Sequence, residues 1–201
     1  MRRIIKETSP GDFEQWKTDN PGKTFRDLLP GKIKTNLKKS LMKEQYGLCG
    51  YCCSTLTKDK SHIEHIIPHS SGKQQLDYTN LLCSCIGYNI NRETCGHKKD
   101  NDFIPISPTD VDCESHFKYS TSGKILPSNS SDTDAKQTID TLNLNSYELV
   151  TARKTKIKLL LLDTDDIRND KTSYISKYST PVNGKLEAFT PMILYVINNY
   201  I

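Results

Sequence analysis

The chain has 201 residues and a formal net charge of +4, with 35% hydrophobic and 8% aromatic residues. This composition is globular and excludes a disordered chain, and the length suits one domain or a small core with added segments. The mildly basic charge permits a nucleic-acid partner without requiring one.

The composition also bears on the compartment. The first residues, MRRIIKETSPGDFEQW, are basic but lack the apolar stretch of about 7–15 residues that a secretory signal needs. No apolar run reaches the ~18 residues needed to span a bilayer. We therefore expect a cytoplasmic chain, in which clustered cysteines more often bind metal than form disulfides.

The first 47 residues are predicted to be an arm followed by helices. Residues 1–6 suit a short edge strand or a docking arm. Asp12 is expected to cap a helix over 13–19, and Thr24 a turn over 25–29. A longer helix is predicted over 32–46, with Gly47 as its stop.

One face of that longer helix is basic. It is either simply solvated or contacts phosphates or a partner, and it carries Lys32, Lys34, Lys38, Lys39 and Lys43.

The second half of the chain is predicted to be a β-hairpin followed by helices. Residues 115–127 alternate around a Ser122-Gly123 turn, which indicates the hairpin. Helices are expected over 133–143 and 147–162, the second capped by Ser146. An acidic loop follows, and a final helix over 191–199 has Thr190 as its cap and Pro191 at its first position.

Between Leu48 and Lys99 lie six of the seven cysteines and four of the five histidines. Cys49-Gly50-Tyr51-Cys52 is a C-x2-C knuckle, and two thiolates at this spacing can bind one tetrahedral ion. A structural zinc needs two more ligands from Cys83, Cys85 and Cys95, and the residues alone leave that choice open. Cys53 should point away and Cys113 is remote, and the alternative for the whole set is buried, reduced thiols.

An acid–histidine pair lies inside the same span. The run 62–68 (HIEHIIP) reads as a short strand ending at Pro68. A strand's period of two places Glu64 and His65 on opposite faces, so both reach one site only if the backbone twists there. A neutral histidine suits a general base, and a carboxylate with an imidazole can anchor a divalent ion for phosphodiester hydrolysis.

These residues resemble the HNH endonuclease family. The shared pattern is a C-x2-C knuckle, an acid–His pair before a proline, Asn80-Leu81-Leu82, a cysteine pair, and a helix bearing a metal ligand and lysines. The spacing from Asn80 selects Cys85 over Cys83. The nine residues IGYNINRET between Cys85 and Cys95 depart from the family's close spacing. They add polar residues near the site, which either have a function or are ordinary polar loop residues: Asn89, Asn91 and Arg92.

The resemblance implies a fold and a role for each residue. The fold is α+β, with a ββα-metal core and a structural Zn²⁺ held by Cys49, Cys52, Cys85 and Cys95. His65 would be the general base, oriented by Asn80. Glu64 and His97 would hold a catalytic divalent ion such as Mg²⁺ or Mn²⁺. Lys98 and Lys99 would contact nucleic acid, and His62 would either support Glu64 or be merely exposed.

The wider likeness is to the PtuB-type HNH nucleases of Septu and retron anti-phage systems. It implies an endonuclease acting on DNA beside a PtuA-like ATPase partner, and self-association is the other option. We expect an arm with helices (1–47), a nuclease core (48–105) and a docking region (106–201). The alternatives are an RNA-cleaving nuclease, with tRNA as one target, and a non-catalytic zinc-finger module that binds nucleic acid or protein.

Overall fold

The computed structural model describes residues 1–68, 74–87 and 94–201. Asn89, Asn91 and Arg92, named above from the long insertion, lie outside these residues. Within them the chain mixes helices with two small antiparallel sheets, as an α+β chain should. None of the helices found there is both long and apolar enough to cross a membrane.

The elements follow one another as a helical N-terminal part, a first sheet, a second sheet and a helical C-terminal part. In chain order they are α1 (Gly11–Asp19), the 3-10 turn η1 (Phe25–Asp27), α2 (Lys32–Glu44), β1 (Ser61–His65), η3 (Tyr78–Asn80), β2 (Leu81–Cys85), α3 (Cys95–Lys99), β3 (Phe117–Tyr119), β4 (Ile125–Pro127), α4 (Thr133–Thr141), α5 (Tyr147–Leu162), α6 (Thr164–Asn169), α7 (Lys171–Ser179) and α8 (Thr190–Asn199).

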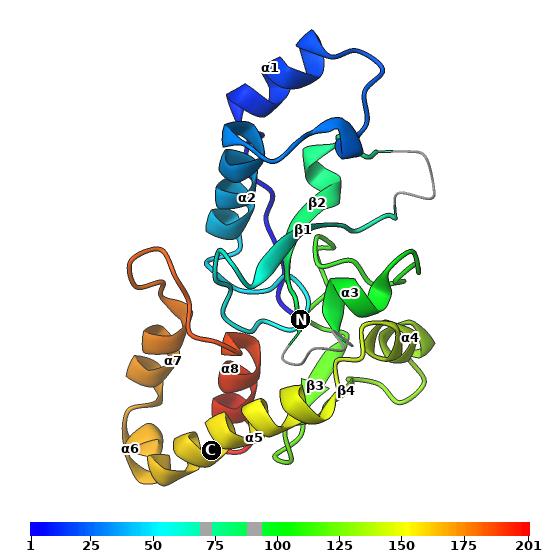
Figure 1. Ribbon diagram of the computed structural model, residues 1–201. Coiled ribbons are helices and arrows are strands. Elements are labelled where there is room, and N and C mark those ends of the chain that lie inside the picture. Colours follow the sequence, from blue (N-terminus) through cyan, green and yellow to red (C-terminus); the bar gives the residue numbers. More distant parts are fainter. Residues whose placement is uncertain (69–73, 88–93) are drawn as a thin grey trace.

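The first sheet pairs β1 with β2 antiparallel, with Ser61 opposite Cys85 and His65 opposite Leu81. Every residue of β2 is buried, because α2 and α3 both pack against it. β1 ends at His65 rather than continuing to Pro68, so the strand is shorter than the apolar pattern suggested. Figure 1 shows α1, α2 and this sheet in the upper half of the molecule and α5 to α8 in the lower half.

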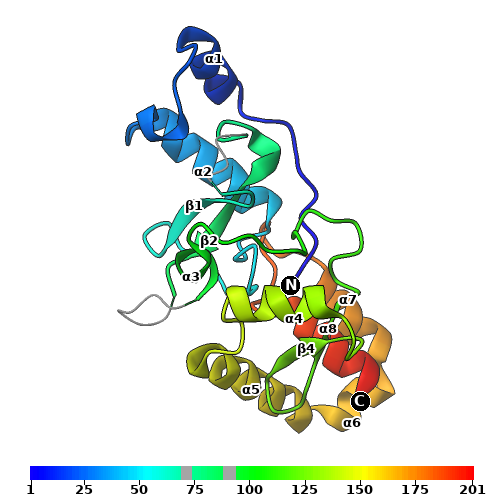
Figure 2. The same ribbon diagram turned by 90° about the vertical axis from the view of Figure 1, so that its right-hand side faces the viewer.

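The N-terminal arm is an extended segment and not a strand in the structure. It runs from the lower half up to α1 (Figures 1 and 2), and Met1 and Ile4 are buried along it. The amino terminus donates to Tyr119 Oη at 2.8 Å, and the Ile4 amide donates to the Pro108 carbonyl at 2.7 Å. The arm therefore ties the two halves together.

A buried ion pair fixes the arm against the first sheet. The Lys6 ammonium bonds to the Glu44 carboxylate at the end of α2 and donates to the Leu81 carbonyl at 2.7 Å. Tyr78 Oη donates to Glu44 Oε2 at 2.9 Å. Burial lowers the pKa of Lys6, and Glu44 opposes that shift. One carboxylate thus links α2, the arm and the start of β2.

The second sheet is the predicted hairpin, in which β3 pairs antiparallel with β4. Gly123 makes the turn with a positive φ of 88°, and a Cβ there would come within 2.5 Å of the Val150 carbonyl oxygen. The glycine therefore lets the hairpin touch α5. Arg153 of α5, only 2% exposed, donates through Nε to the Gly123 carbonyl at 2.7 Å and secures this contact.

Several predicted boundaries were wrong. Asp12 does not cap α1, which begins at Gly11, and its carboxylate instead accepts from Asn36 at 2.7 Å. The acidic segment predicted as a loop forms α6 and α7, anchored by buried Ile167 and by the Asp170 carboxylate, which accepts from the Ser173 amide. Thr190 is the first residue of α8 and not its cap, because Phe189 before it has a left-handed φ of 63°.

Candidate metal centre and active site

Four cysteines from three elements meet in one buried place. Cys49 and Cys52 come from the turn after α2, Cys85 ends β2, and Cys95 begins α3. Their sulfur atoms all lie within 4.8 Å of one another. Gly50 allows the turn to lie flat on β2, since a Cβ there would be 3.0 Å from Leu82 Cδ2. We call this group the cysteine cage.

The pKa values of three cage thiols indicate that the group needs a compensating cation. Burial raises the pKa of Cys49, but hydrogen bonds from Cys52, Cys85 and Cys95 outweigh it and hold that pKa well below the usual range. The pKa values of Cys85 and Cys95 are raised well above it, chiefly by their bonds to Cys49. The four thiols cannot all ionise together unless a cation compensates them. Four buried thiolates are the donor set that tetrahedral zinc prefers, so the residues fit a structural metal.

The other cysteines lie outside the cage. Cys83, two residues before Cys85 on the same strand, points to the opposite side, where its thiol donates to the Lys38 carbonyl at 3.6 Å. Cys53 belongs to a separate small cluster with Leu48 and Leu186. Burial raises the pKa of the Cys53 and Cys83 thiols to about 12, which is typical of inert structural cysteines.

A second group of polar residues lies beside the cage, between β1 and α3. Glu64 Oε1 accepts from Lys99 Nζ at 3.0 Å, and Glu64 Oε2 lies 3.3 Å from His62 Nε2. The His62 ring stacks on that of His97, with centroids 4.3 Å apart and planes inclined by 25°. We call His62, Glu64, His97 and Lys99 the Glu64 cluster. It joins two residues of one strand face to two residues of one short helix.

Lys99 is placed differently from the prediction that it contacts nucleic acid. Its side chain is fully buried, and Nζ also donates to the His65 carbonyl at 2.9 Å. A buried ammonium is stable only when it is paired and hydrogen-bonded, and Glu64 supplies the charge. Because Lys99 occupies Oε1, the oxygen of Glu64 that faces His62 is the one that could bind a cation. Lys98, by contrast, is exposed.

Gly96 lets α3 approach this cluster. A Cβ at Gly96 would lie 2.7 Å from His62 Nε2 and 2.8 Å from Glu64 Oε2, both inside any normal contact. The Gly96 amide donates to Ser84 Oγ at 3.0 Å and so fixes the helix on β2. No pattern in the sequence marks Gly96, because the close approach of two elements leaves no local signal.

His65 occupies the other face of β1, as the strand period requires. Its ring lies edge-on to Phe25 at a centroid distance of 4.7 Å, and Nε2 lies 2.9 Å from the Gln75 carbonyl oxygen. A carbonyl can only accept, so Nε2 carries the proton in the neutral ring and Nδ1 has the lone pair. Neither of these ring partners belongs to the Glu64 cluster, and His65 meets the cluster through its main-chain carbonyl, which accepts from Lys99 Nζ.

Asn80 closes the loop that follows His65. Its Oδ1 accepts from the Ile67 amide at 2.7 Å, and its Nδ2 donates to the carbonyls of Ile67 and Gln74 at 3.1 and 3.2 Å. The buried amide thus clamps both sides of the loop between β1 and η3. This geometry suits a residue that fixes where His65 points.

His62 is the residue whose role the sequence left open between support of Glu64 and simple exposure. It is partly buried, and it contacts both Glu64 and His97. Among the described residues, no hydrogen-bond partner is found for its buried Nδ1. The useful signal in the sequence was its place two residues before Glu64, on the same face of the strand.

The chain is similar to two proteins from bacterial retrons. It is 32% identical, over 161 aligned residues, to a protein of Vibrio cholerae serotype O1 biovar El Tor that carries the name HNH endonuclease of retron Vc95, covering 76% of this chain and 78% of that protein. It is 26% identical to the corresponding retron Ec83 protein of Escherichia coli, over 77% of this chain and 78% of that one. A scan against protein-family models gave no match.

The cage yields a test with a matched pair of variants. Cys85→Ala should lose the bound metal, whereas Cys83→Ala, two residues away on the same strand, should keep about one zinc per chain. Removing the metal with a chelator should unfold the segment 48–99, because so small a loop-rich core buries too little apolar surface to persist alone. Elemental analysis and circular dichroism measure both effects. Near-native structure in a metal-free sample would contradict the assignment.

Proposed function

The chain belongs to the HNH endonuclease family of retrons, whose members are nucleic-acid hydrolases, and on that premise we propose that it cleaves phosphodiester bonds in DNA as part of anti-phage defence. The observation that carries the proposal is the Glu64 cluster. A carboxylate with one oxygen beside His62, whose ring stacks on that of His97, is an arrangement suited to a divalent cation and a phosphate, and it lies against a cysteine cage that fits zinc.

We assign β1, β2 and α3 to the ββα-metal core of the family. In this assignment the cage (Cys49, Cys52, Cys85 and Cys95) is a structural zinc site, and the Glu64 cluster is the catalytic one. The support is topological: two antiparallel strands are followed by a short helix packed on β2, and this helix carries both Cys95 of the cage and His97 of the cluster.

Glu64 and His97 would hold the catalytic ion, for which Mg²⁺ and Mn²⁺ both suit a carboxylate and an imidazole. Bound there, the ion would neutralise charge on the phosphate and on the leaving oxygen. Lys99 fixes one oxygen of Glu64, and the stack with His62 orients the His97 ring. Lys98 is exposed beside them and would contact a phosphate.

His65 would take the proton from the attacking water. The Gln75 carbonyl holds Nε2 protonated, so Nδ1 is the basic atom. Asn80 is a positioning residue, since its amide clamps the loop that follows His65. Because the contacts of His65 lie on the other face of β1, the scissile phosphate would bind at the end of this strand, where both faces can be reached.

In this proposal residues 1–47 form the N-terminal arm with its helices, 48–105 the nuclease core and 106–201 a docking region. The docking region and the arm would bind a PtuA-like ATPase or a second copy of the chain. Supporting this, α5 presents apolar side chains to solvent, among them Leu159 and Leu162 at 55% and 80% exposure. Exposed leucines together on one element are typical of an interaction surface rather than of a free helix.

His65→Ala and His65→Gln should each lower cleavage by about 10²–10⁴-fold, the usual contribution of a general base. Zinc content and melting should stay near those of the native protein, with the volume-conserving glutamine as the safer variant. The matched control is His116→Gln, because His116 bonds to Asp132 outside the core. The assay uses protein co-purified with the product of its neighbouring gene. DNA and RNA substrates are offered side by side with Mg²⁺ or Mn²⁺.

Undiminished cutting by both His65 variants would refute the role of His65. Cutting of RNA alone would replace DNA as the target. A complex that cuts neither, with its metal sites filled, would favour a non-catalytic zinc module.

Gly96→Ala tests the catalytic cluster through packing alone. The added methyl group should displace Glu64 or His62, and a displacement of about 1 Å should cost roughly 10²-fold in cleavage. Gly11→Ala is the matched helical control, because a Cβ there meets nothing within 4 Å. Equal cleavage by the two glycine variants, measured at equal zinc content, would place catalysis elsewhere.

The docking proposal is tested by Leu159→Glu with Leu162→Glu, which should abolish co-purification of the ATPase or shift the chain to a monomer in light scattering. Thr151→Glu with Lys158→Glu, exposed on the same helix, should leave the complex intact. Retention of the partner by the leucine variant would show that α5 is not the docking surface.

A further inference from the structure

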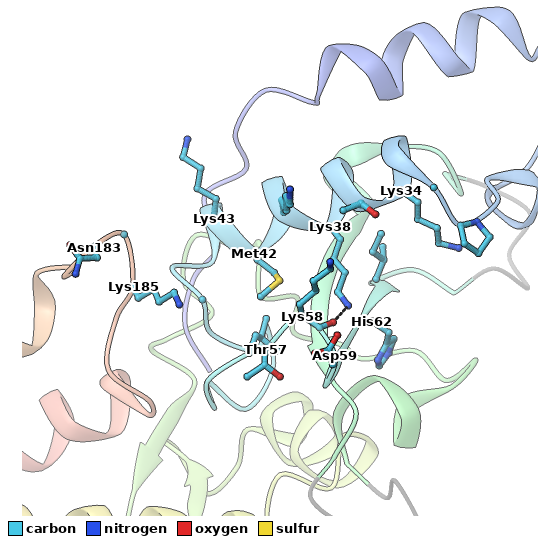
Figure 3. A pocket seen from close by; sticks show the side chains of 18 of the residues that line it. Lys34, Lys38, Met42, Lys43, Thr57, Lys58, Asp59, His62, Asn183 and Lys185 are labelled. Atoms are coloured by element: carbon cyan, nitrogen blue, oxygen red, sulfur yellow. Dashed lines mark hydrogen bonds between the residues drawn. The ribbon is translucent and has the colours of Figure 1, made fainter.

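A groove with a volume of about 950 Å³ runs along α2 (Figure 3). One wall is α2, another is the turn that precedes β1, and the segment around Asn183 to Lys185 closes one end. Apolar side chains, including Met42, Leu56 and Ile63, line it. We call it the α2 groove.

Lysines surround this groove. Six of its lining residues are lysines, namely Lys34, Lys38, Lys39, Lys43, Lys58 and Lys185, and Asp59 is the one acid among the described lining residues. Lys43 pairs with Glu7 at 3.3 Å. In the described chain no acidic partner lies within ion-pairing distance of Lys39, Lys58 or Lys185, and all three are exposed. The groove is therefore strongly positive on an otherwise mildly basic protein.

Lys38 has a structural part in the groove. Its Nζ donates to the carbonyls of Lys58 and Ser61, at 2.7 and 2.5 Å, and so joins α2 to the turn before β1. Carbonyls do not neutralise the ammonium, so its charge adds to the potential of the groove. The two walls are held together without an acidic residue.

The groove opens onto the candidate catalytic cluster. His62 lines it, as Figure 3 shows beside Lys58 and Asp59, and His62 Nε2 is 3.3 Å from Glu64 Oε2. A polyanion lying in the groove would thus have one part beside Glu64. This continuity favours a nucleic-acid substrate over an acidic peptide, because only a substrate must bring a phosphate next to Glu64.

We propose that the α2 groove holds one strand of nucleic acid and leads its backbone to the Glu64 cluster, with the lysines on the phosphates and the bases against the apolar floor. The inference rests on the proposed function. Lysine-lined grooves bind single strands through the phosphate backbone, and apolar floors accept bases of any sequence. A rigid duplex is too wide to enter a concavity of this size and would meet only its rim, so a single strand fits better.

The test compares two triple variants that lose the same charge. Lys39→Ala/Lys58→Ala/Lys185→Ala removes the three exposed lysines of the groove that have no acidic partner in the described chain. Lys136→Ala/Lys154→Ala/Lys158→Ala removes exposed lysines from α4 and α5 as the control. Both are made in a His65→Ala background and titrated with fluorescently labelled single-stranded DNA, single-stranded RNA and duplex DNA over a range of salt.

For the single strands, the groove variant should lower the slope of log K against log salt by about 2, because each lost phosphate contact contributes roughly 0.7. The control triple should keep the native slope, and a lysine-to-arginine triple at the groove positions should restore binding. The DNA and RNA arms show which strand is bound more tightly.

A native slope in the groove variant would overturn the proposal, as would a loss confined to duplex DNA. Cleavage by the His65-intact complex is measured separately. A lowered slope without any cleavage would therefore leave the groove assigned while the nuclease function fails, and cleavage with a native slope would do the reverse.

Discussion

The meeting of four buried thiols is the constraint on which the rest of this structure depends. The cage draws its ligands from a turn, a strand and a helix, and these are the elements that also carry Glu64 and His97 or support them. The sheet has only two strands, and α3 has only five residues, too few for a helix that is stable alone. A closed metal site would supply the folding energy that so little buried apolar surface cannot.

Two ion pairs hold together the segments around the cage. The Glu64 carboxylate is shared between Lys99 and His62, and the Glu44 carboxylate between Lys6 and Tyr78. In each case a buried ammonium from one segment is neutralised by an acid from another, which fixes distant parts of the chain in one register. The first pair positions a candidate metal ligand, and the second secures the N-terminal arm against the first sheet.

Much of this arrangement could be predicted from local patterns. The hairpin turn at Ser122-Gly123 and the cap at Ser146 depend on neighbouring residues, and the structure has both. The spacing that pointed to Cys85 rather than Cys83 agrees with the group of sulfur atoms that meet. Strand parity also held, since the side chains of Glu64 and His65 contact different partners.

What could not be predicted depends on tertiary contact. Lys99 looks like a surface lysine in the sequence, and only the packing of α3 on β1 reveals that its charge is buried beside Glu64. Gly96 and His62 gain their meaning from each other across two elements. The acidic segment after α5 forms helices because Ile167 is buried against the core, a contact that its polar composition conceals.

The placement of Cys95 bears on how the molecule matures. The first cage ligand is Cys49 and the last is Cys95, so the cage is completed only after about half of the chain has been synthesised. His97 follows two residues later on the same short helix. If a metal closes the cage, a nascent chain that has not yet bound it would lack the fixed start of α3 and, with it, the placement of His97 against His62. The Glu64 cluster would thus assemble only after the cage has closed, in the second half of synthesis.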